Sequence, residues 1–231
     1  KAEEELNRIM DQLVLVNEKL GVVGSLTRHD VGNKLMAAKS NLYLLKKQIG
    51  DNPNLAKYLD RIDSALASSD EIFEFSRLYE RIGVEKSSSE NVFECFNQAA
   101  ALMMNLGSVQ VVNECKGLEV VADSLLKQLF YNFIDNSLKH GEKVTKIRLH
   151  YNKEDDGGVS LVYEDNGVGV SEANKPKLFD RGFTTGRGSG LGLYLVMKMM
   201  NFYGWTITET GEVGKGVRFV ISIPKLNMGA K

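Results

Sequence analysis

The stretch that decides the fold is NFIDNSLKH, residues 132–140, which lies within an amphipathic helical pattern. Asn132, Asn136 and Lys139 follow one another at spacings of four and three residues, so one face of the helix carries two amides and one cation. Such a face suits phosphate oxygens and Mg²⁺, which prefers oxygen ligands and keeps water and substrate phosphates in its shell. A solvated polar helix face is the alternative interpretation.

The first of two glycine-rich segments downstream is DNGVG, residues 165–169, at the end of an expected strand. The carboxylate of Asp165 can accept a hydrogen bond from an exocyclic amine such as that of adenine. Gly167 and Gly169 let a planar base lie against the backbone. A simple strand-ending turn, which Asp-Asn-Gly favours, is the alternative here.

The second glycine-rich segment is GRGSGLGL, residues 186–193, directly before an apolar helix. Glycines let backbone N–H groups approach an anion closely, and the positive end of the following helix can face a phosphate. The segment is not a dinucleotide-binding motif, because it lacks a preceding strand and a carboxylate about 20 residues further on. It is not a Walker A loop either, because the Gly-Lys-Ser/Thr end is missing. Alone, it indicates either a phosphate site or a turn.

The rest of the C-terminal half alternates between helical and strand patterns. Helices are expected at 91–106, at 123–139 with Asp123 as the N-cap, and at 191–203. A turn-rich connection is expected at 152–158 and a long loop at 166–190. Strands are expected at 109–112, 118–121, 146–151, 159–163, 205–209 and 217–223. This order predicts a two-layer α/β sandwich with its helices on one face.

The N-terminal half has apolar residues at alternating steps of three and four. These seams run over residues 6–23 and 35–49, and again over 55–73 after a helix stop and turn at 50–54. Two long amphipathic helices joined by a short turn predict an antiparallel helical hairpin. One hairpin cannot bury both sides of its seam, so a homodimer that forms a four-helix bundle is expected. A hairpin packed on the chain's own second domain is the alternative.

Residues 83–89 are mostly small or polar and are expected to be a linker. The predicted domains are therefore a helical hairpin at 1–82 and an α/β sandwich at 90–231, an α+β chain overall.

Composition excludes several classes of protein. The 231 residues carry 29 Lys and Arg against 30 Asp and Glu, so no nucleic-acid partner is expected. The sequence has no apolar run long enough to span a bilayer and no signal peptide, which favours a cytoplasmic location. It opens on KAEEEL without methionine, so it is expected to be a fragment that lacks an upstream sensor or membrane anchor. Cys95 and Cys115 are expected to be reduced, buried residues.

The order of the motifs is far more specific than any one of them. NFIDNSLKHG resembles the N box, EDNGVGV the first glycine box, KLFDRGFTT the F box and GRGSGLGLYLVMK the second glycine box of sensor histidine kinases. Thr27-Arg28-His29-Asp30-Val31-Gly32-Asn33 resembles their H box. The chain therefore resembles the dimerisation hairpin and ATP-binding domain of this family, which shares a superfamily with gyrase-type, mismatch-repair and chaperone ATPases.

The resemblance implies a role for each matching residue. Asp165 would bind the adenine amine, Asn136 would coordinate Mg²⁺, and Lys139 would contact phosphate. Residues 171–187 would form the lid over ATP, anchored by Phe179. The remaining residues implied to bind nucleotide are Asn132, His140, Gly167, Gly169, Thr184, Thr185, Arg187, Gly188, Gly190, Leu191 and Gly192.

The resemblance also implies the reaction. ATP would phosphorylate His29, with Asp30 orienting or deprotonating the imidazole, and the phosphoryl group would pass to an aspartate on a response-regulator receiver domain. A nucleotide-binding dimeric scaffold, or a regulator dominated by phosphatase activity, is the alternative.

Three positions bear on the expected reaction and on nucleotide binding. Asn132 stands where hydrolytic superfamily members have a glutamate that activates water, and an amide cannot act as a general base. Asn33, four residues after His29, matches a variant in kinases that also dephosphorylate their partner. Gly216-Val217 stands where relatives often have Gly-Thr or Gly-Ser, so a hydroxyl that helps hold adenine is expected to be missing.

Overall fold

This computed structural model describes most of the chain, namely residues 31–47, 53–104, 106–186 and 188–228. Several expectations lie outside these ranges: the seam at 6–23, the first part of the turn at 50–54, and the side chains of His29, Asp30 and Arg187. The chain divides into two compact units, Lys1–Glu80 and Arg81–Lys231. The first unit holds the helical hairpin and the second holds the sheet.

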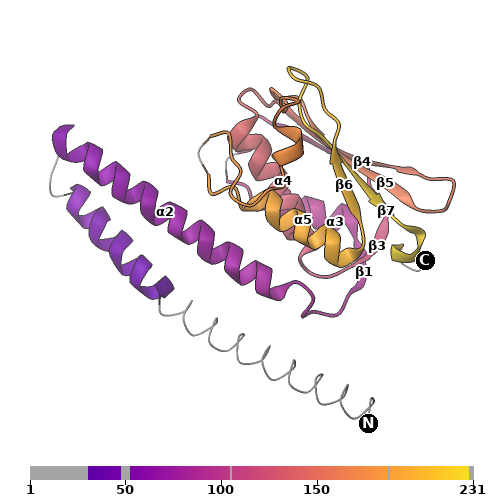
Figure 1. Cartoon of the computed structure of the whole chain (residues 1–231), viewed down its shortest axis with the longest axis horizontal. Helices are drawn as coiled ribbons and strands as arrows, with labels where there is room; N and C mark the ends of the chain where they lie inside the picture. Colours follow the sequence, from indigo (N-terminus) through magenta and orange to yellow (C-terminus); the bar gives the residue numbers. More distant parts are fainter. Residues whose placement is uncertain (1–30, 48–52, 105, 187, 229–231) are drawn as a thin grey trace, which may run out of the picture. The chain divides into compact units, whose positions relative to one another are not determined.

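The hairpin consists of a helix over residues 31–47 and helix α2, Pro53–Arg81 (Figure 1). Proline at the first helical position costs no hydrogen bond, because an N–H there has no intrahelical partner. For this reason α2 begins inside the stretch that was expected to be a turn.

Ion pairs fix the direction of the two helices. Lys46 Nζ lies 2.7 Å from Asp63 Oδ2, and Lys39 pairs with Asp70. Residues late in the first helix thus meet residues early in α2, so the helices run antiparallel, as expected.

The apolar seam of the hairpin is only partly covered. Leu42 and Leu59 are buried, whereas Leu45, Leu55 and Ile62 remain 43%, 42% and 47% exposed. The expectation that one hairpin leaves apolar side chains uncovered is therefore met, and the dimer that would cover them stays a prediction.

The second unit is built on a five-stranded sheet of order β2-β4-β5-β7-β6. Strands β2 and β4 are parallel, and the other neighbours are antiparallel. The strands are β2 Gln110–Asn113, β4 Lys146–Lys153, β5 Val159–Asp165, β6 Thr206–Glu209 and β7 Arg218–Ile223. A separate antiparallel pair joins β1 Ser88–Asn91 to β3 Glu119–Ala122.

Three helices cover one face of this sheet (Figure 1). They are α3 Val92–Ala101, α4 Leu126–His140 and α5 Gly192–Tyr203, and short 3₁₀ turns occupy Lys175–Lys177 and Lys225–Asn227. The predicted two-layer sandwich with helices on one face is confirmed.

Aromatic rings join the helices to the sheet. The ring of Phe133 on α4 stacks on Phe219 of β7 at 4.8 Å between centroids and lies 5.1 Å from Tyr163 of β5. Side chains alternate along a strand, so Leu161, Tyr163 and Asp165 all point to the helix-covered face. Strand β5 therefore carries the carboxylate of Asp165 into the layer between sheet and helices.

One predicted cap is wrong. Helix α4 begins at Leu126, after Leu125 as N-cap residue, and no side chain caps it. Asp123 is buried instead, where its carboxylate accepts hydrogen bonds from the Tyr203 hydroxyl and from the N–H of Leu125 at 3.0 Å. A tertiary partner at the end of α5 decides the conformation, and no local pattern announces it.

The expected linker is partly a strand, since β1 begins at Ser88 within 83–89. The domain boundaries stay a prediction. Along the described ranges, no helix is long and apolar enough to cross a membrane.

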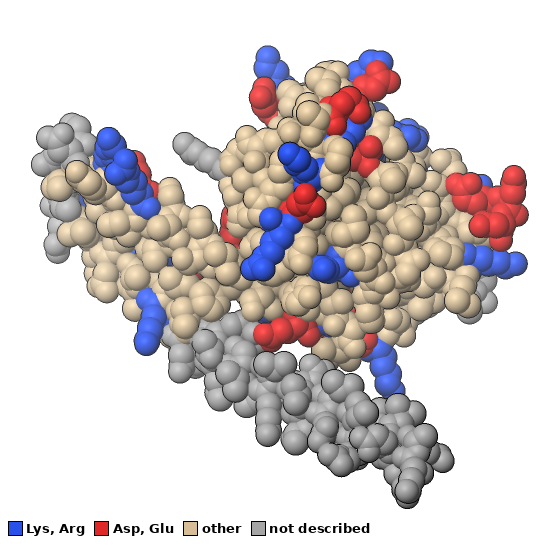
Figure 2. Space-filling model, in the orientation of Figure 1, with Lys and Arg blue, Asp and Glu red and all other residues tan. Residues whose placement is uncertain are grey.

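The end of the sheet at the β4–β5 connection is acidic. Figure 2 shows red side chains gathered at one end of the sandwich, where the β4–β5 connection carries Glu154, Asp155 and Asp156. Gly158 closes this connection, because its carbonyl accepts from the N–H of Glu154 at 3.0 Å. The site described next lies at the opposite end of α4 and β5.

Candidate nucleotide-binding site

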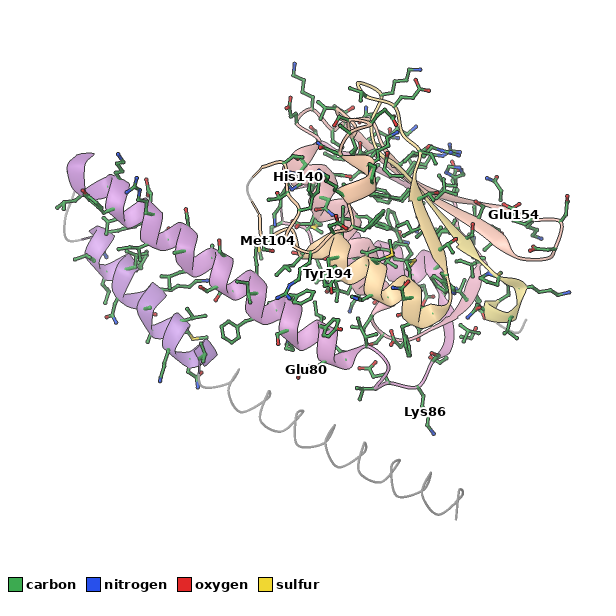
Figure 3. All side chains as sticks on the ribbon, in the orientation of Figure 1. Glu80, Lys86, Met104, His140, Glu154 and Tyr194 are labelled. Atoms are coloured by element: carbon green, nitrogen blue, oxygen red, sulfur yellow. The ribbon has the colours of Figure 1, made fainter. Side chains whose placement is uncertain are left out.

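The three segments singled out by sequence meet at one end of the sandwich. The Asn132 amide on α4 donates to the carbonyl of Gly192 at the start of α5, at 3.4 Å. The Val168 N–H, just past β5, donates to the carbonyl of Gly141 at the end of α4, at 3.3 Å. Figure 3 shows His140 at this end and Glu154 at the far end of the sheet. The motifs therefore form one site.

Asp165 is the centre of the site. Its carboxylate is 7% exposed. Oδ1 accepts hydrogen bonds from the backbone N–H groups of Gly167 at 2.9 Å and Val217 at 3.1 Å. Oδ2 accepts from the hydroxyl of Ser137 on α4 at 2.5 Å. A buried acceptor with this many donors is held in a single orientation.

A second hydroxyl stands behind the first. The Ser137 Oγ lies 2.7 Å from the Tyr163 hydroxyl oxygen, and Tyr163 is fully buried. Burial raises the pKa of Tyr163 well above its ordinary value, so the phenol keeps its proton. Sequence reasoning missed both residues. The available signal was that Ser137 directly follows Asn136 and that Tyr163 precedes Asp165 by two strand positions.

Glycines make room for the turn that holds Asp165. Gly216 has φ +114°, and a Cβ there would overlap the carbonyl of Asp165. Gly169 has φ +72°, and a Cβ would lie 2.7 Å from the carbonyl oxygen of Glu212. Only glycine fits these two positions, because L side chains rarely adopt this backbone and have no space here.

The two asparagines of α4 differ in their hydrogen bonds. Asn132 is 9% exposed, accepts from Gln128 Nε2 at 3.3 Å, and donates to Gly192. The Nδ2 of Asn136 is buried, and no described residue accepts a hydrogen bond from it. Asn132 thus joins α4 to α5, whereas the Nδ2 of Asn136 makes no such link among the described residues.

This donor set fits Mg²⁺ only together with a substrate. Among the residues that the structure describes, no group of three or more His, Cys, Asp and Glu could hold a metal ion. One amide oxygen, from Asn136, is the kind of single protein ligand that Mg²⁺ takes when phosphates and water complete its shell.

The end of α4 carries the cation and the imidazole. Lys139 Nζ lies 2.8 Å from Asp135 Oδ2, one turn back on the same helix. His140 is half-buried, and its pKa is lowered by burial and then by the charge of Lys139. A Cβ on Gly186 would lie 3.4 Å from His140 Nδ1, so the second glycine-rich segment passes beside this ring.

The loop between β5 and α5 is anchored at its first part. Phe179 is half-buried, with its ring centroid 6.1 Å from that of Phe219. Lys175 Nζ donates to the carbonyl of Gly211 at 2.7 Å and lies 3.4 Å from the buried carboxylate of Glu209. Lys175 and Phe179 therefore fasten the root of the loop to the β6–β7 end of the sheet.

The later part of the loop is exposed. Thr184, Thr185 and Gly188 face solvent, and within the described residues the Thr184 hydroxyl hydrogen-bonds to Gly186 alone, at 3.2 Å. The N–H of Gly182 donates to the carbonyl of Gly190 at 3.1 Å, which closes the exposed part into a smaller loop. Leu191 then turns inward and is buried where α5 begins.

The expected site residues outside this end are few. Asn33 is exposed on the helix at 31–47 in the first unit. His29, Asp30 and Arg187 lie outside the described ranges.

A family comparison agrees with this geometry. Residues 122–227 match the family model described as histidine kinase-, DNA gyrase B-, and HSP90-like ATPase. The match runs from the residue before Asp123 to the end of the sheet and includes the whole site.

Curated relatives are sensor kinases. The signal transduction histidine-protein kinase AtoS of Escherichia coli (strain K12) is 27% identical over 96% of this chain and 38% of its own length. The sensor histidine kinase GraS of Staphylococcus haemolyticus (strain JCSC1435) is 27% identical over 68% of this chain and 52% of its own length. The chain thus spans about half or less of these relatives.

Solved structures share the fold. Full-length ShkA in complex with AMPPNP gives a TM-score of 0.66 at 20% identity, covering 90% of this chain and 46% of ShkA. The nucleotide-free catalytic domain of the histidine kinase ThkA gives 0.53 at 26% identity, covering 61% of this chain and 97% of that domain.

Over residues 122–227 the fold and the site agree with the matching family model, so this segment resembles the histidine kinase-, DNA gyrase B-, and HSP90-like ATPase family. The resemblance of the chain to sensor histidine kinases is confirmed by its relatives.

Proposed function

We propose that this chain is the kinase core of a sensor histidine kinase that uses ATP to phosphorylate His29. The observation that carries the proposal is the buried carboxylate of Asp165, which accepts hydrogen bonds from α4, from the turn after β5 and from the residue before β7. The AMPPNP bound to ShkA, an analogue of ATP, supports the choice of nucleotide.

In this proposal the base and the phosphates are bound by different residues. Asp165 accepts a hydrogen bond from the adenine amine, and Gly167 and Gly169 leave room for the ring. Asn136 offers its amide oxygen to Mg²⁺, which when bound neutralises charge on the phosphates. The lid residues Thr184, Thr185, Gly186 and Arg187, with Gly188 and Gly190, contact phosphate once the lid closes over it.

Asn132 protects the nucleotide from hydrolysis. Its amide has no basic lone pair that could remove a proton from water, and it is already committed to Gly192 and Gln128. ATP therefore waits for a nucleophile from the other domain.

His29 is the proposed nucleophile. A neutral ring nitrogen attacks the γ-phosphorus as the bond to the bridging oxygen breaks and ADP leaves. Asp30 orients the ring and takes up its other proton. The phosphoryl group then passes from His29 to an aspartate of a receiver domain while Asp30 returns the proton to the ring, which regenerates neutral histidine.

We further propose that the chain acts as a homodimer in the cytoplasm, with domains at 1–82 and 90–231. The exposed apolar residues Leu45, Leu55 and Ile62 on the hairpin support a second copy, which would complete a four-helix bundle. An upstream sensor would act through the first helix.

A labelling experiment tests the proposal. The protein is incubated with γ-labelled ATP and Mg²⁺ beside His29→Gln and the control His150→Gln, a half-buried histidine on β4. We expect acid-labile, base-stable label on the wild type and on His150→Gln, and none on His29→Gln. Label that survives in His29→Gln would name another acceptor. Nucleotide binding without any label would favour the dimeric scaffold.

Asn33 supports a second activity. It is exposed on the helix at 31–47 and follows His29 by four positions in the sequence, and an amide there can position water against a phosphorylated aspartate. We expect Asn33→Ala to keep the autokinase rate and to lose removal of phosphate from the receiver domain. A variant that strips its partner at the full rate would exclude this role.

A further inference from the structure

A buried pair of hydroxyl groups lies behind the proposed adenine contact. Ser137 is 4% exposed and bridges the Tyr163 hydroxyl, at 2.7 Å, to the carboxylate of Asp165. Neither Ser137 nor Tyr163 is among the residues proposed to contact phosphate. The pair is linked to the proposed adenine contact through Asp165.

The acceptor positions of Asp165 can be counted. A carboxylate offers two positions on each oxygen. Oδ1 is filled by the N–H groups of Gly167 and Val217, and Oδ2 takes the Ser137 hydroxyl. Among the described residues no other donor reaches this carboxylate, so one position, on Oδ2, stays open.

The hydrogen bonds that link Tyr163, Ser137 and Asp165 have one consistent arrangement of their protons. The buried phenol of Tyr163 keeps its proton and can donate it to Ser137 Oγ, its hydrogen-bond partner among the residues that the structure describes. Ser137 then directs its single proton to the Oδ2 of Asp165. The hydroxyl rotor of Ser137 is thereby fixed from behind.

We propose that Ser137, oriented by Tyr163, is a positioning residue that aims the open acceptor of Asp165 at the 6-amino group of a purine and so sets the preference for adenine. The proposal rests on the nucleotide-binding function proposed above. A guanine base presents a carbonyl oxygen at the same position, and two acceptors repel. A purine without a substituent presents only a C–H group, which makes no comparable bond.

This role also bears on the residue after Gly216. Relatives often carry a hydroxyl after Gly216. This chain has Val217 there, which donates its backbone N–H to Asp165. Ser137 approaches the same carboxylate from the opposite side, from α4. The hydroxyl reaches Asp165 from a helix in place of the last strand.

The test compares two nucleotides that differ only at the 6-position, ATP and purine riboside triphosphate, by calorimetry on the full chain. The variants are Ser137→Ala and Tyr163→Phe, with Ser160→Ala, on the opposite face of β5, as the control. We expect Ser137→Ala to bind ATP roughly 3- to 10-fold more weakly and to bind purine riboside triphosphate as the wild type does. Tyr163→Phe should show the same selective loss, at roughly 2- to 3-fold.

The outcomes separate the two proposals. If Ser137→Ala weakens both nucleotides by the same factor, its role is structural and the inference is overturned. If the wild type binds neither nucleotide, the proposed function fails as well. Should Ser137→Ala not fold, as judged by the fluorescence of buried Trp205, the Tyr163→Phe ratio decides in the same way.

Discussion

The two ends of the proposed nucleotide site are built differently. At the base end, Asp165 is buried and receives three hydrogen bonds from three separate segments. At the phosphate end, Thr184, Thr185 and Gly188 are exposed, and Thr184 hydrogen-bonds to Gly186 of its own loop. The base end is ready before a ligand arrives, whereas the phosphate end must be completed by the ligand.

The difference suggests a division of labour. A preorganised base end selects the nucleotide at little entropic cost, because its groups are already ordered. An open phosphate end lets the γ-phosphoryl group remain accessible to a nucleophile from another domain. The predictions below test this division, beginning with the change that should damage the base end most.

The largest effect should come from Gly216→Ala. The left-handed backbone alone costs alanine about 1–2 kcal/mol, and the overlap with the carbonyl of Asp165 adds to that cost. Gly214→Ala is the matched control, because Gly214 has φ +82° and nothing within 4 Å. Urea unfolding followed by the fluorescence of Trp205 should show a clearly larger loss for Gly216→Ala. Equal losses of unfolding free energy would mean that the carbonyl of Asp165 does not oppose a side chain at position 216.

Asp165→Asn should come next. The amide places two donors where the site requires an acceptor, so we expect the affinity for ATP to fall roughly 10- to 100-fold. Asp155→Asn removes the same charge at the exposed β4–β5 turn and should change nothing. Calorimetry with ATP and with adenosine measures both variants. Adenosine affinity unaffected by Asp165→Asn would place the base elsewhere.

Phe179→Ala should act on the other end and less strongly. Without its packing on Phe219 the root of the lid loosens, so ATP should dissociate about 3- to 10-fold faster. Adenosine has no phosphates for the lid to hold, so its affinity should stay within about 2-fold. Stopped-flow displacement of a fluorescent ATP analogue gives the rate. If the affinities for ATP and adenosine fell by the same factor, the proposed separation of the two ends would be wrong.

The smallest effect concerns pH. Burial lowers the pKa of His140 at the phosphate end and of His150 on the outer face of the sheet. The unfolded chain therefore binds protons more readily than the folded one, so stability is complete above the unfolded pKa of about 6.5 and declines as the pH falls below it.

Melting temperatures from about pH 5 to pH 7.5 test this behaviour. His140→Gln and His150→Gln should each flatten part of the decline, and the double variant should flatten more of it. A double variant with the full decline would assign the pH dependence to carboxylates instead.

Much of the fold could be predicted because local patterns and tertiary structure agree. The helix that carries Asn132 and Asn136 and the strand that ends at Asp165 have clear periodicity, and both fold as expected. Asp123 shows where this agreement stops. It resembles a cap in sequence, yet a tyrosine 80 positions away takes its carboxylate.

The site was predictable to the same extent. Motifs indicated Asp165, because a carboxylate between a strand and glycines is a local signal. They did not indicate Ser137 and Tyr163, whose contact depends on the position of α4 along β5. That register is set by the packing of Phe133 between Tyr163 and Phe219, which no single stretch of sequence contains.

The bond from Gly182 to Gly190 has a consequence for chain entropy. It joins the two ends of the exposed part of the loop between β5 and α5, so residues between Gly182 and Gly190 form a closed loop of their own. The closure entropy of such a loop grows only with the logarithm of its length, about 0.6 kcal/mol for each doubling. Residues inserted between Gly182 and Gly190 would therefore lengthen the lid at little cost in stability and without disturbing the hydrogen bonds of Asp165.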